Sequence, residues 1–154
     1  MSAPNFCMLL RKHIGSGRIT DISQPKLERI IRFTIEHLNE LGDLCRKLLI
    51  VEIMGKHSNI IFCTEDGKII DSIKHVSAQM SSVREVLPGR EYFIPDTMHK
   101  ADPLTVSRAD FSALLTGKPA PVSKALYTSF TGISPVTAEE ICFLAGLDSS
   151  VPAK

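Results

Sequence analysis

Residues 51–62, VEIMGKHSNIIF, begin and end like an apolar strand but carry a polar interruption in the middle. They continue the apolar run KLLIV, place Glu52 within it, and then insert GKHSN before apolar residues resume at Ile60. Glycine inside a strand pattern is typical of a turn or bulge. The stretch therefore predicts a strand that ends near Met54, a short polar connection, and a second strand.

The neighbouring segments predict further strands. RITDISQ and LERIIRFTIEHL alternate apolar and polar residues, as a strand with one solvated face does. NIIFCT and KIIDSIK flank the hairpin signal EDG. We therefore expect residues 18–74 to form about five strands in a mostly antiparallel meander.

Helices are expected at both ends of the chain. APNFCMLLRKHIGSG has helical apolar spacing and is stopped by glycines. After a loop-like stretch near residues 75–98, three helices are predicted, with Ser107 capping the first and Ser134 capping the last, which has Pro135 at its first position. Strands followed by helices predict an α+β fold: a twisted, mostly antiparallel sheet and then a small helical segment.

The composition is that of an ordinary globular protein. The net charge is +1, hydrophobic residues make up 44% and charged residues 23%, so bulk charge favours no particular partner. Lys and Arg are in mild excess over residues 1–90, which is compatible with a phosphate backbone. The four cysteines lack metal-site spacing and are expected to be buried, reduced thiols. No signal peptide and no apolar run of ~18 residues is visible, which indicates the cytoplasm and no membrane partner.

Several segments together resemble the N-terminal domain of the NFACT family. They follow the family's order and span nearly the whole chain: FCMLLRKHIGSGRITDISQPKLERI, LIVEIMGKHSNIIF, DGKIIDSIKHVS, VREVLPGREY and TGISPVTAEEI. The segment with which family members begin has no match here, so we expect an internal fragment. By this resemblance, residues 1–105 are the second part of the N-terminal domain, and residues 106–154 open a helix-hairpin-helix region.

The resemblance implies a role in ribosome-associated quality control. Family members bind the large ribosomal subunit, recruit alanyl-tRNA and support template-free C-terminal alanine tailing, and their N-terminal domain contacts the tRNA anticodon arm. The family's Asp-Arg pair falls on Glu28 and Arg29, with Glu in place of the usual Asp. Its Glu-Ile-Met motif falls on Glu52, Ile53 and Met54.

These residues could meet on one surface, because the start of one antiparallel strand lies beside the end of the next. Arg29 would contact a phosphate or a base edge, while Glu28 and Glu52 would orient it or accept from bases. Lys56 and His57 would supply donors at the rim. The simpler alternatives are a solvated Glu52, a core Met54 and a polar connection at residues 56–59.

No catalytic site is expected. The family's domain is structurally similar to the N-terminal domain of formamidopyrimidine-DNA glycosylases, which use an N-terminal proline amine as nucleophile. Pro4 has no free amine. No cofactor or metal motif is visible. Some family members carry the label fibronectin- or fibrinogen-binding, so a surface adhesin is the alternative function.

Without the family's first strands, one sheet edge or face would be uncovered, which predicts a homo-oligomer.

Overall fold

The computed structural model describes residues 4–96 and 98–153, which form two compact units. The sheet unit contains the chain up to Pro25 and from Arg29 to Pro95. The helical unit contains Lys26–Glu28 and the chain from Asp96 onward.

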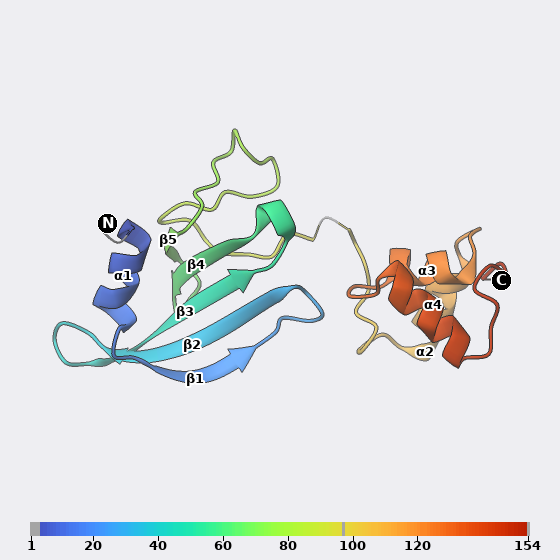
Figure 1. Cartoon of the computed structure of the whole chain (residues 1–154), viewed down its shortest axis with the longest axis horizontal. Coiled ribbons are helices and arrows are strands. Elements are labelled where there is room, and N and C mark those ends of the chain that lie inside the picture. Colours follow the sequence, from blue (N-terminus) through green and yellow to red (C-terminus); the bar gives the residue numbers. More distant parts are fainter. Residues whose placement is uncertain (1–3, 97, 154) are drawn as a thin grey trace. The chain divides into compact units, whose positions relative to one another are not determined.

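The sheet unit is an antiparallel meander of five strands within the described residues, which confirms the predicted topology (Figure 1). The strands are β1 (Arg18–Ser23), β2 (Ile30–Leu38), β3 (Leu44–Glu52), β4 (Asn59–Thr64) and β5 (Ile69–Ser72), and they are neighbours in sequence order. Helix α1 (Asn5–Ile14) precedes them, and the short 3-10 helix η1 (Gly55–His57) joins β3 to β4.

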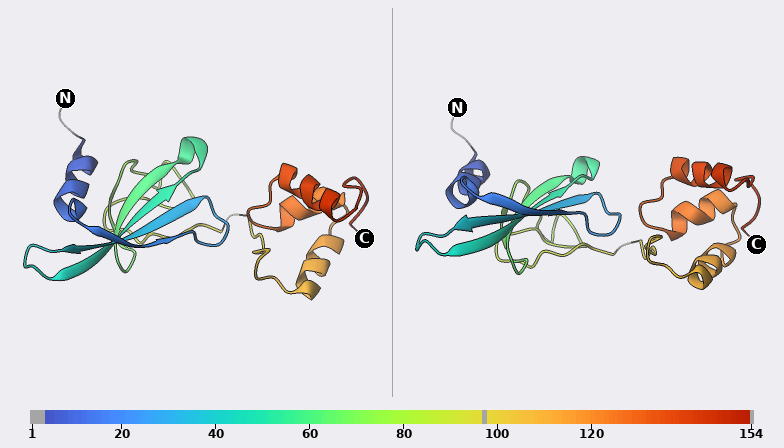
Figure 2. Two further views of the ribbon diagram at one scale, coloured as in Figure 1. Left: turned by 60° about the horizontal axis from the view of Figure 1, so that its bottom comes forward. Right: turned by 90° about the horizontal axis from the view of Figure 1, so that it is seen from below.

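Alternation along the strands gives the sheet two apolar faces. On one face, Ile30, Ile50, Ile61 and Cys63 form a buried cluster that is covered by the loop at residues 73–95 through Val76, Val86, Tyr92 and Ile94. Helix α1 lies on the opposite side of the sheet from this loop (Figure 2, right-hand view). The loop thus acts as a second layer without regular secondary structure.

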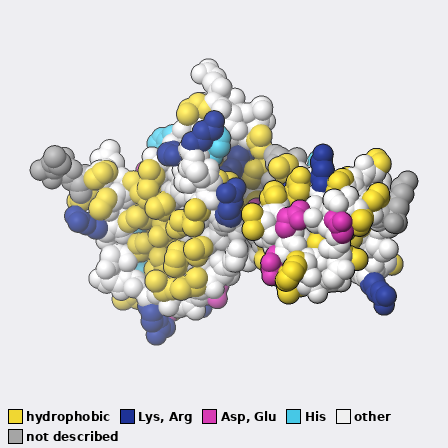
Figure 3. Space-filling view, turned by 45° about the vertical axis from the view of Figure 1, so that its right-hand side comes forward, with side chains coloured by type: hydrophobic (Ala, Val, Ile, Leu, Met, Phe, Trp, Pro, Cys, Tyr) yellow, Lys and Arg dark blue, Asp and Glu magenta, His cyan; other side chains and the backbone are white. Residues whose placement is uncertain are grey.

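The face on the α1 side is only partly covered. Its neighbouring strands place apolar side chains in two rows, and most of these side chains are half-buried: Ile22, Phe33 and Leu49 in one row, and Ile31, Val51 and Ile60 in the other. Ile22, on the edge strand β1, is 61% exposed. Figure 3 shows hydrophobic side chains gathered over a broad area of this unit.

The helical unit contains α2 (Arg108–Thr116), α3 (Val122–Ser129) and α4 (Pro135–Leu144). Both predicted caps are confirmed: the Ser107 side chain accepts from the Asp110 amide, and the Ser134 side chain accepts from the Thr137 amide. Caps of this kind satisfy amides that would otherwise lack a partner at a helix start. The core of the unit is a cluster of small and apolar residues: Val122, Leu126, Phe130, Ala138 and Cys142.

The four cysteines are free. Cys63 and Cys142 are buried, as expected, whereas Cys7 and Cys45 are only half-buried, which corrects the expectation for these two. Within the described ranges, no helix has the length and apolar character needed to cross a membrane.

Candidate nucleic-acid interface at a strand end

The end of β3 and the start of β2 meet at one end of the sheet. Ile30 pairs with Glu52 across the two strands, and the Ile53 amide donates to the Arg29 carbonyl over 2.8 Å. The Arg29 side chain is exposed and Ile53 is 51% exposed. The antiparallel pairing therefore brings the backbones of Arg29, Glu52 and Ile53 together. We refer to Arg29 and residues 52–57 as the strand-end site.

Glu28 belongs to the helical unit, where it is half-buried in the turn before β2. Its proximity to the other residues of the strand-end site stays a prediction.

Glu52 is the most buried residue of the strand-end site, at 2% exposure. One carboxylate oxygen forms an ion pair with the Arg84 guanidinium, and the other accepts from the Tyr92 hydroxyl over 2.9 Å. The sequence predicts this carboxylate on a solvated face, or in a site where it accepts from a base or orients Arg29. The structure corrects this expectation: both oxygens face inward and are bound by residues of the covering loop.

Arg84 links the loop to the strand end through several contacts. Its guanidinium also donates to the Phe93 carbonyl over 2.7 Å and lies 5.4 Å from the centre of the Tyr92 ring. A buried charge is tolerated when its partners satisfy its hydrogen bonds, and this cluster satisfies both Glu52 oxygens. Burial, followed by the negative charge of Glu52, raises the pKa of Tyr92 above its usual value, so the hydroxyl remains a donor.

Neither Arg84 nor Tyr92 was predicted as part of the site. Both lie in VREVLPGREY, a segment that contributed to the family resemblance without being given a role. That segment was the available signal for these two residues, but its local sequence does not indicate that it folds back onto Glu52.

The turn after β3 projects two basic side chains. Gly55 has a φ of +59°, a conformation that favours glycine, and the Met54 amide donates to the Ser58 hydroxyl over 2.9 Å. Lys56 and His57 are exposed, and neither side chain has a hydrogen-bond or ion-pair partner within the part of the chain that the structure describes. Met54 packs against the sheet core, as its simpler interpretation predicted.

A pocket of about 660 Å³ opens beside this turn, between the strand end and the covering loop. Lys56, His57, Lys74 and His75 give it a basic rim, although His75 is paired with Asp71 over 2.6 Å. Val76, Met80, Val83 and Val86 supply an apolar wall. A basic rim beside an apolar wall suits a ligand with phosphates and flat, weakly polar faces. We refer to this cavity as the loop pocket.

The Asn59 side chain fixes the geometry of the loop pocket. It is buried, donates to the Lys74 carbonyl over 3.0 Å and accepts from the Lys74 amide over 3.0 Å. Asn59, the last residue of the polar stretch GKHSN, thus links β4 to the segment after β5 by hydrogen bonds. In the described residues, no group of three or more His, Cys, Asp or Glu side chains could hold a metal ion.

A family match over residues 1–154 defines the class of protein: this chain belongs to the family described as NFACT N-terminal and middle domains. Among curated proteins, it is similar to the Rqc2 homolog RqcH of Bacillus subtilis (strain 168), with 44% identity over 149 residues, covering 96% of this chain and 26% of that protein. The Rqc2 homolog RqcH of Streptococcus suis (strain 05ZYH33) is 42% identical over 141 residues, which cover 90% of this chain and 25% of that protein. The chain therefore spans about a quarter of the length of these relatives.

Solved structures have the same fold. The N-terminal part of the fibronectin/fibrinogen-binding protein from Streptococcus suis matches with a TM-score of 0.81 and 38% identity, covering 97% of this chain and 56% of that one. The fibrinogen binding protein from Staphylococcus aureus matches with a TM-score of 0.83 and 33% identity, covering 99% of this chain and 56% of that one.

Proposed function

We propose that this chain is a non-enzymatic tRNA- and ribosome-binding module of a cytoplasmic ribosome-associated quality control factor. The whole protein would recruit alanyl-tRNA to stalled large ribosomal subunits for C-terminal alanine tailing. The observation that carries this proposal is the 44% identity to a protein named as an Rqc2 homolog, over 96% of the chain.

The strand-end site supports an RNA-binding role by its chemistry. Arg29, Lys56 and His57 are exposed donors at one end of the sheet. Such side chains position RNA through its phosphates, while bases are recognised on their edges and faces. Ile53, which is half-exposed, offers an apolar surface to a base. We assign the tRNA anticodon arm to this surface, with Glu28 beside Arg29 as a further polar contact.

Glu52 and Met54 support the strand-end site without contacting the RNA. Because both oxygens of Glu52 are bound by Arg84 and Tyr92, its role is to hold the loop pocket in shape. Met54 packs on the core and fixes the start of the basic turn. Both motif residues would thus be positioning residues.

Binding of fibronectin or fibrinogen is the alternative function. It is favoured by the names of the solved relatives from Streptococcus suis and Staphylococcus aureus. An adhesin has to reach the cell surface, so the two functions differ in where the full-length protein is found. Display on washed cells, together with binding of soluble fibronectin at the same surface, would favour the adhesin.

The experiment is a cellular test of the full-length protein. We expect Arg29→Ala combined with Lys56→Ala to reduce both the tRNA recovered with the protein and the alanine tailing of a stalled reporter chain. The matched control, Lys68→Ala with Lys124→Ala, removes the same charge from exposed positions outside the strand-end site. Unchanged tRNA recovery and unchanged tailing in the first variant would refute the proposed function.

A further inference from the structure

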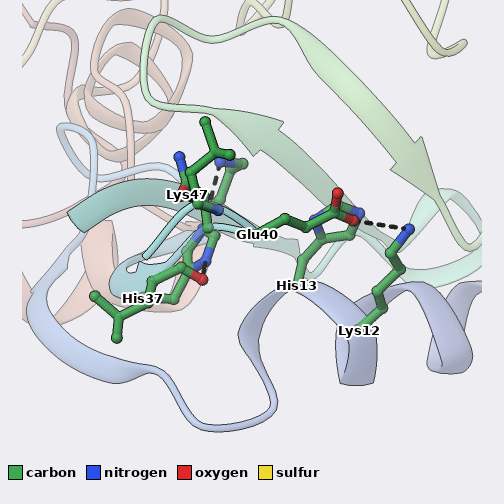
Figure 4. A pocket seen from close by; sticks show the side chains of 8 residues that line it. Lys12, His13, His37, Glu40 and Lys47 are labelled. Carbon is green, nitrogen blue, oxygen red and sulfur yellow. Dashed lines mark hydrogen bonds and ion pairs between the residues drawn. The ribbon is translucent and has the colours of Figure 1, made fainter. Parts of the chain in front are cut away.

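A second basic pocket lies at the opposite ends of β2 and β3, beside the C-terminal end of α1 (Figure 4). It has a volume of about 560 Å³ and is lined by side chains of α1, β2, β3 and the turn between the last two. Its charged and titratable residues are Lys12, His13, His37, Glu40 and Lys47. We refer to it as the hairpin pocket.

His37 and Lys47 form the inner part of the hairpin pocket. His37 is buried, at 8% exposure, and its Nδ1 donates to the Leu38 carbonyl over 3.1 Å. The Lys47 ammonium lies 3.3 Å from the other ring nitrogen, Nε2, which accepts a hydrogen bond from it. Lysines that are fully buried are almost always paired, and Lys47 is half-buried. In the described chain, however, no carboxylate lies within ion-pair distance of Lys47.

The α1 side adds a second pair of basic groups. The His13 ring is 5.9 Å from the Phe62 ring, and Lys12 precedes it on the last turn of the helix. Burial, and then the charges of Lys12 and Lys47, lower the pKa of His13 below its ordinary 6.5. These basic groups repel one another when they are charged, and a bound anion would offset this repulsion.

Glu40 is the one acidic side chain in the pocket lining. Its carboxylate lies 3.5 Å from the Lys12 ammonium, and its side chain is 87% exposed. An exposed ion pair of this kind is worth little, so the carboxylate can leave with little loss of stability. The Glu40 side chain extends toward Lys12 along the lining of the pocket that Lys12 and Lys47 share (Figure 4).

We propose that the hairpin pocket is a phosphate-binding site, in which Lys12 and Lys47 bind the oxyanion, the His13 ring donates to it, and Glu40 swings out to admit it. Lysine ammonium groups with donors from several elements suit a phosphate group, which accepts several charge-assisted hydrogen bonds at once. The phosphate comes from an RNA backbone or from a small phosphorylated ligand. This proposal does not depend on the tRNA role of the strand-end site.

The test is a nuclear magnetic resonance titration that follows the ring signals of His13 and His37 in the chain. Sodium phosphate is the first probe, compared with sodium chloride at equal ionic strength, and a short oligouridylate is the second. We expect saturable shifts of both rings with phosphate but not with chloride. Saturation at a lower phosphate concentration with the oligouridylate would identify an RNA backbone as the source, and an effect of free phosphate alone would identify a small ligand.

Two variants with opposite effects make the test specific. Lys47→Met should weaken phosphate binding about tenfold or more, because a charged hydrogen bond is lost. Glu40→Gln should strengthen it about threefold, because a competing negative charge is removed. Lys124→Met, on α3 of the helical unit, is the matched control and should change nothing. Equal shifts with phosphate and chloride, or equal affinity in the Lys47→Met and Glu40→Gln variants, would overturn the proposal.

Discussion

Glu52 is the residue on which the strand end depends. A carboxylate at 2% exposure is stable only if its partners replace the water it has lost, and Arg84 and Tyr92 do so. Local sequence favours a solvated glutamate, because a polar residue in an alternating strand usually faces water. The partners that reverse this preference lie 32 and 40 residues further along the chain. No periodicity reports a contact of that range, so the burial of Glu52 could not be predicted.

We expect Glu52→Gln to destabilise the sheet unit by about 3 kcal/mol, because it leaves the Arg84 guanidinium partly buried without its counter-charge. Tyr92→Phe removes one hydrogen bond to a charged group and should cost about 1.5 kcal/mol. Urea unfolding gives both values. Glu65→Gln is the control, since that side chain is 62% exposed and its loss should cost about 0.5 kcal/mol or less. A Glu52→Gln variant as stable as this control would contradict the role of the buried ion pair.

His13 gives a pH dependence whose sign follows from its lowered pKa. The unfolded chain binds a proton near pH 6.5, whereas the folded chain resists protonation at His13 until a lower pH. Stability from this group is therefore present above about pH 6.5 and is lost as the pH falls through the folded pKa. We expect wild type to lose more unfolding free energy than His13→Gln between about pH 7 and about pH 5. Parallel losses in both proteins would show that His13 is not repelled in the fold.

At the scale of elements, most of the secondary structure follows from local pattern. Alternation predicted β1 and β2, the EDG turn predicted β4 and β5 as a hairpin, and Ser107 and Ser134 predicted two helix starts. The loop at residues 73–95 was predicted as irregular, but its function as a covering layer was not. It has no regular ladder, and it is held by isolated backbone bridges such as the one between Val76 and Val86.

Substitution of two glycines in the helical unit probes the turn before α4 and the turn after it separately. Gly132, between α3 and α4, has a φ of +78°, and a Cβ added there would lie 2.6 Å from the Leu27 Cβ. Gly146, after α4, has a φ of +68° with nothing within 4 Å of an added Cβ. We expect Gly146→Ala to cost about 1 kcal/mol and Gly132→Ala about 2–4 kcal/mol, since only Gly132→Ala adds a clash to the backbone strain.

Hydrogen exchange of the α3 and α4 amides reports these costs within the helical unit itself. Faster exchange in Gly132→Ala than in Gly146→Ala is the expected order. The reverse order would mean that the close approach of Leu27 to Gly132 contributes nothing to the packing of this unit.

At the scale of the whole molecule, the partly covered sheet face and the edge strand β1 favour association. All but the last residue of β1 are exposed, and Ile22 adds an apolar side chain at this edge. Unprotected edges pair readily with other strands. We expect the chain to self-associate at high concentration, and Ile22→Lys to shift it toward the monomer without lowering its stability.

Sedimentation velocity over a concentration series measures this association. Leu41→Lys is the matched control, because Leu41 is 86% exposed but lies in the turn between β2 and β3. A wild-type chain that stays monomeric at every concentration would contradict the prediction, and so would an equal effect of the two lysine substitutions.

The binding of tRNA by the full-length protein, measured as a function of salt, tests the central claim most directly. We expect Arg29→Ala to weaken binding by about 1–3 kcal/mol if the guanidinium contacts a base edge, or to lower the salt slope by about one unit if it contacts a phosphate. Adding Lys56→Ala should lower that slope further, while Lys68→Ala with Lys124→Ala should leave affinity and slope unchanged. If Arg29→Ala with Lys56→Ala binds tRNA with wild-type affinity and wild-type salt slope, the strand-end site is not where this protein binds RNA.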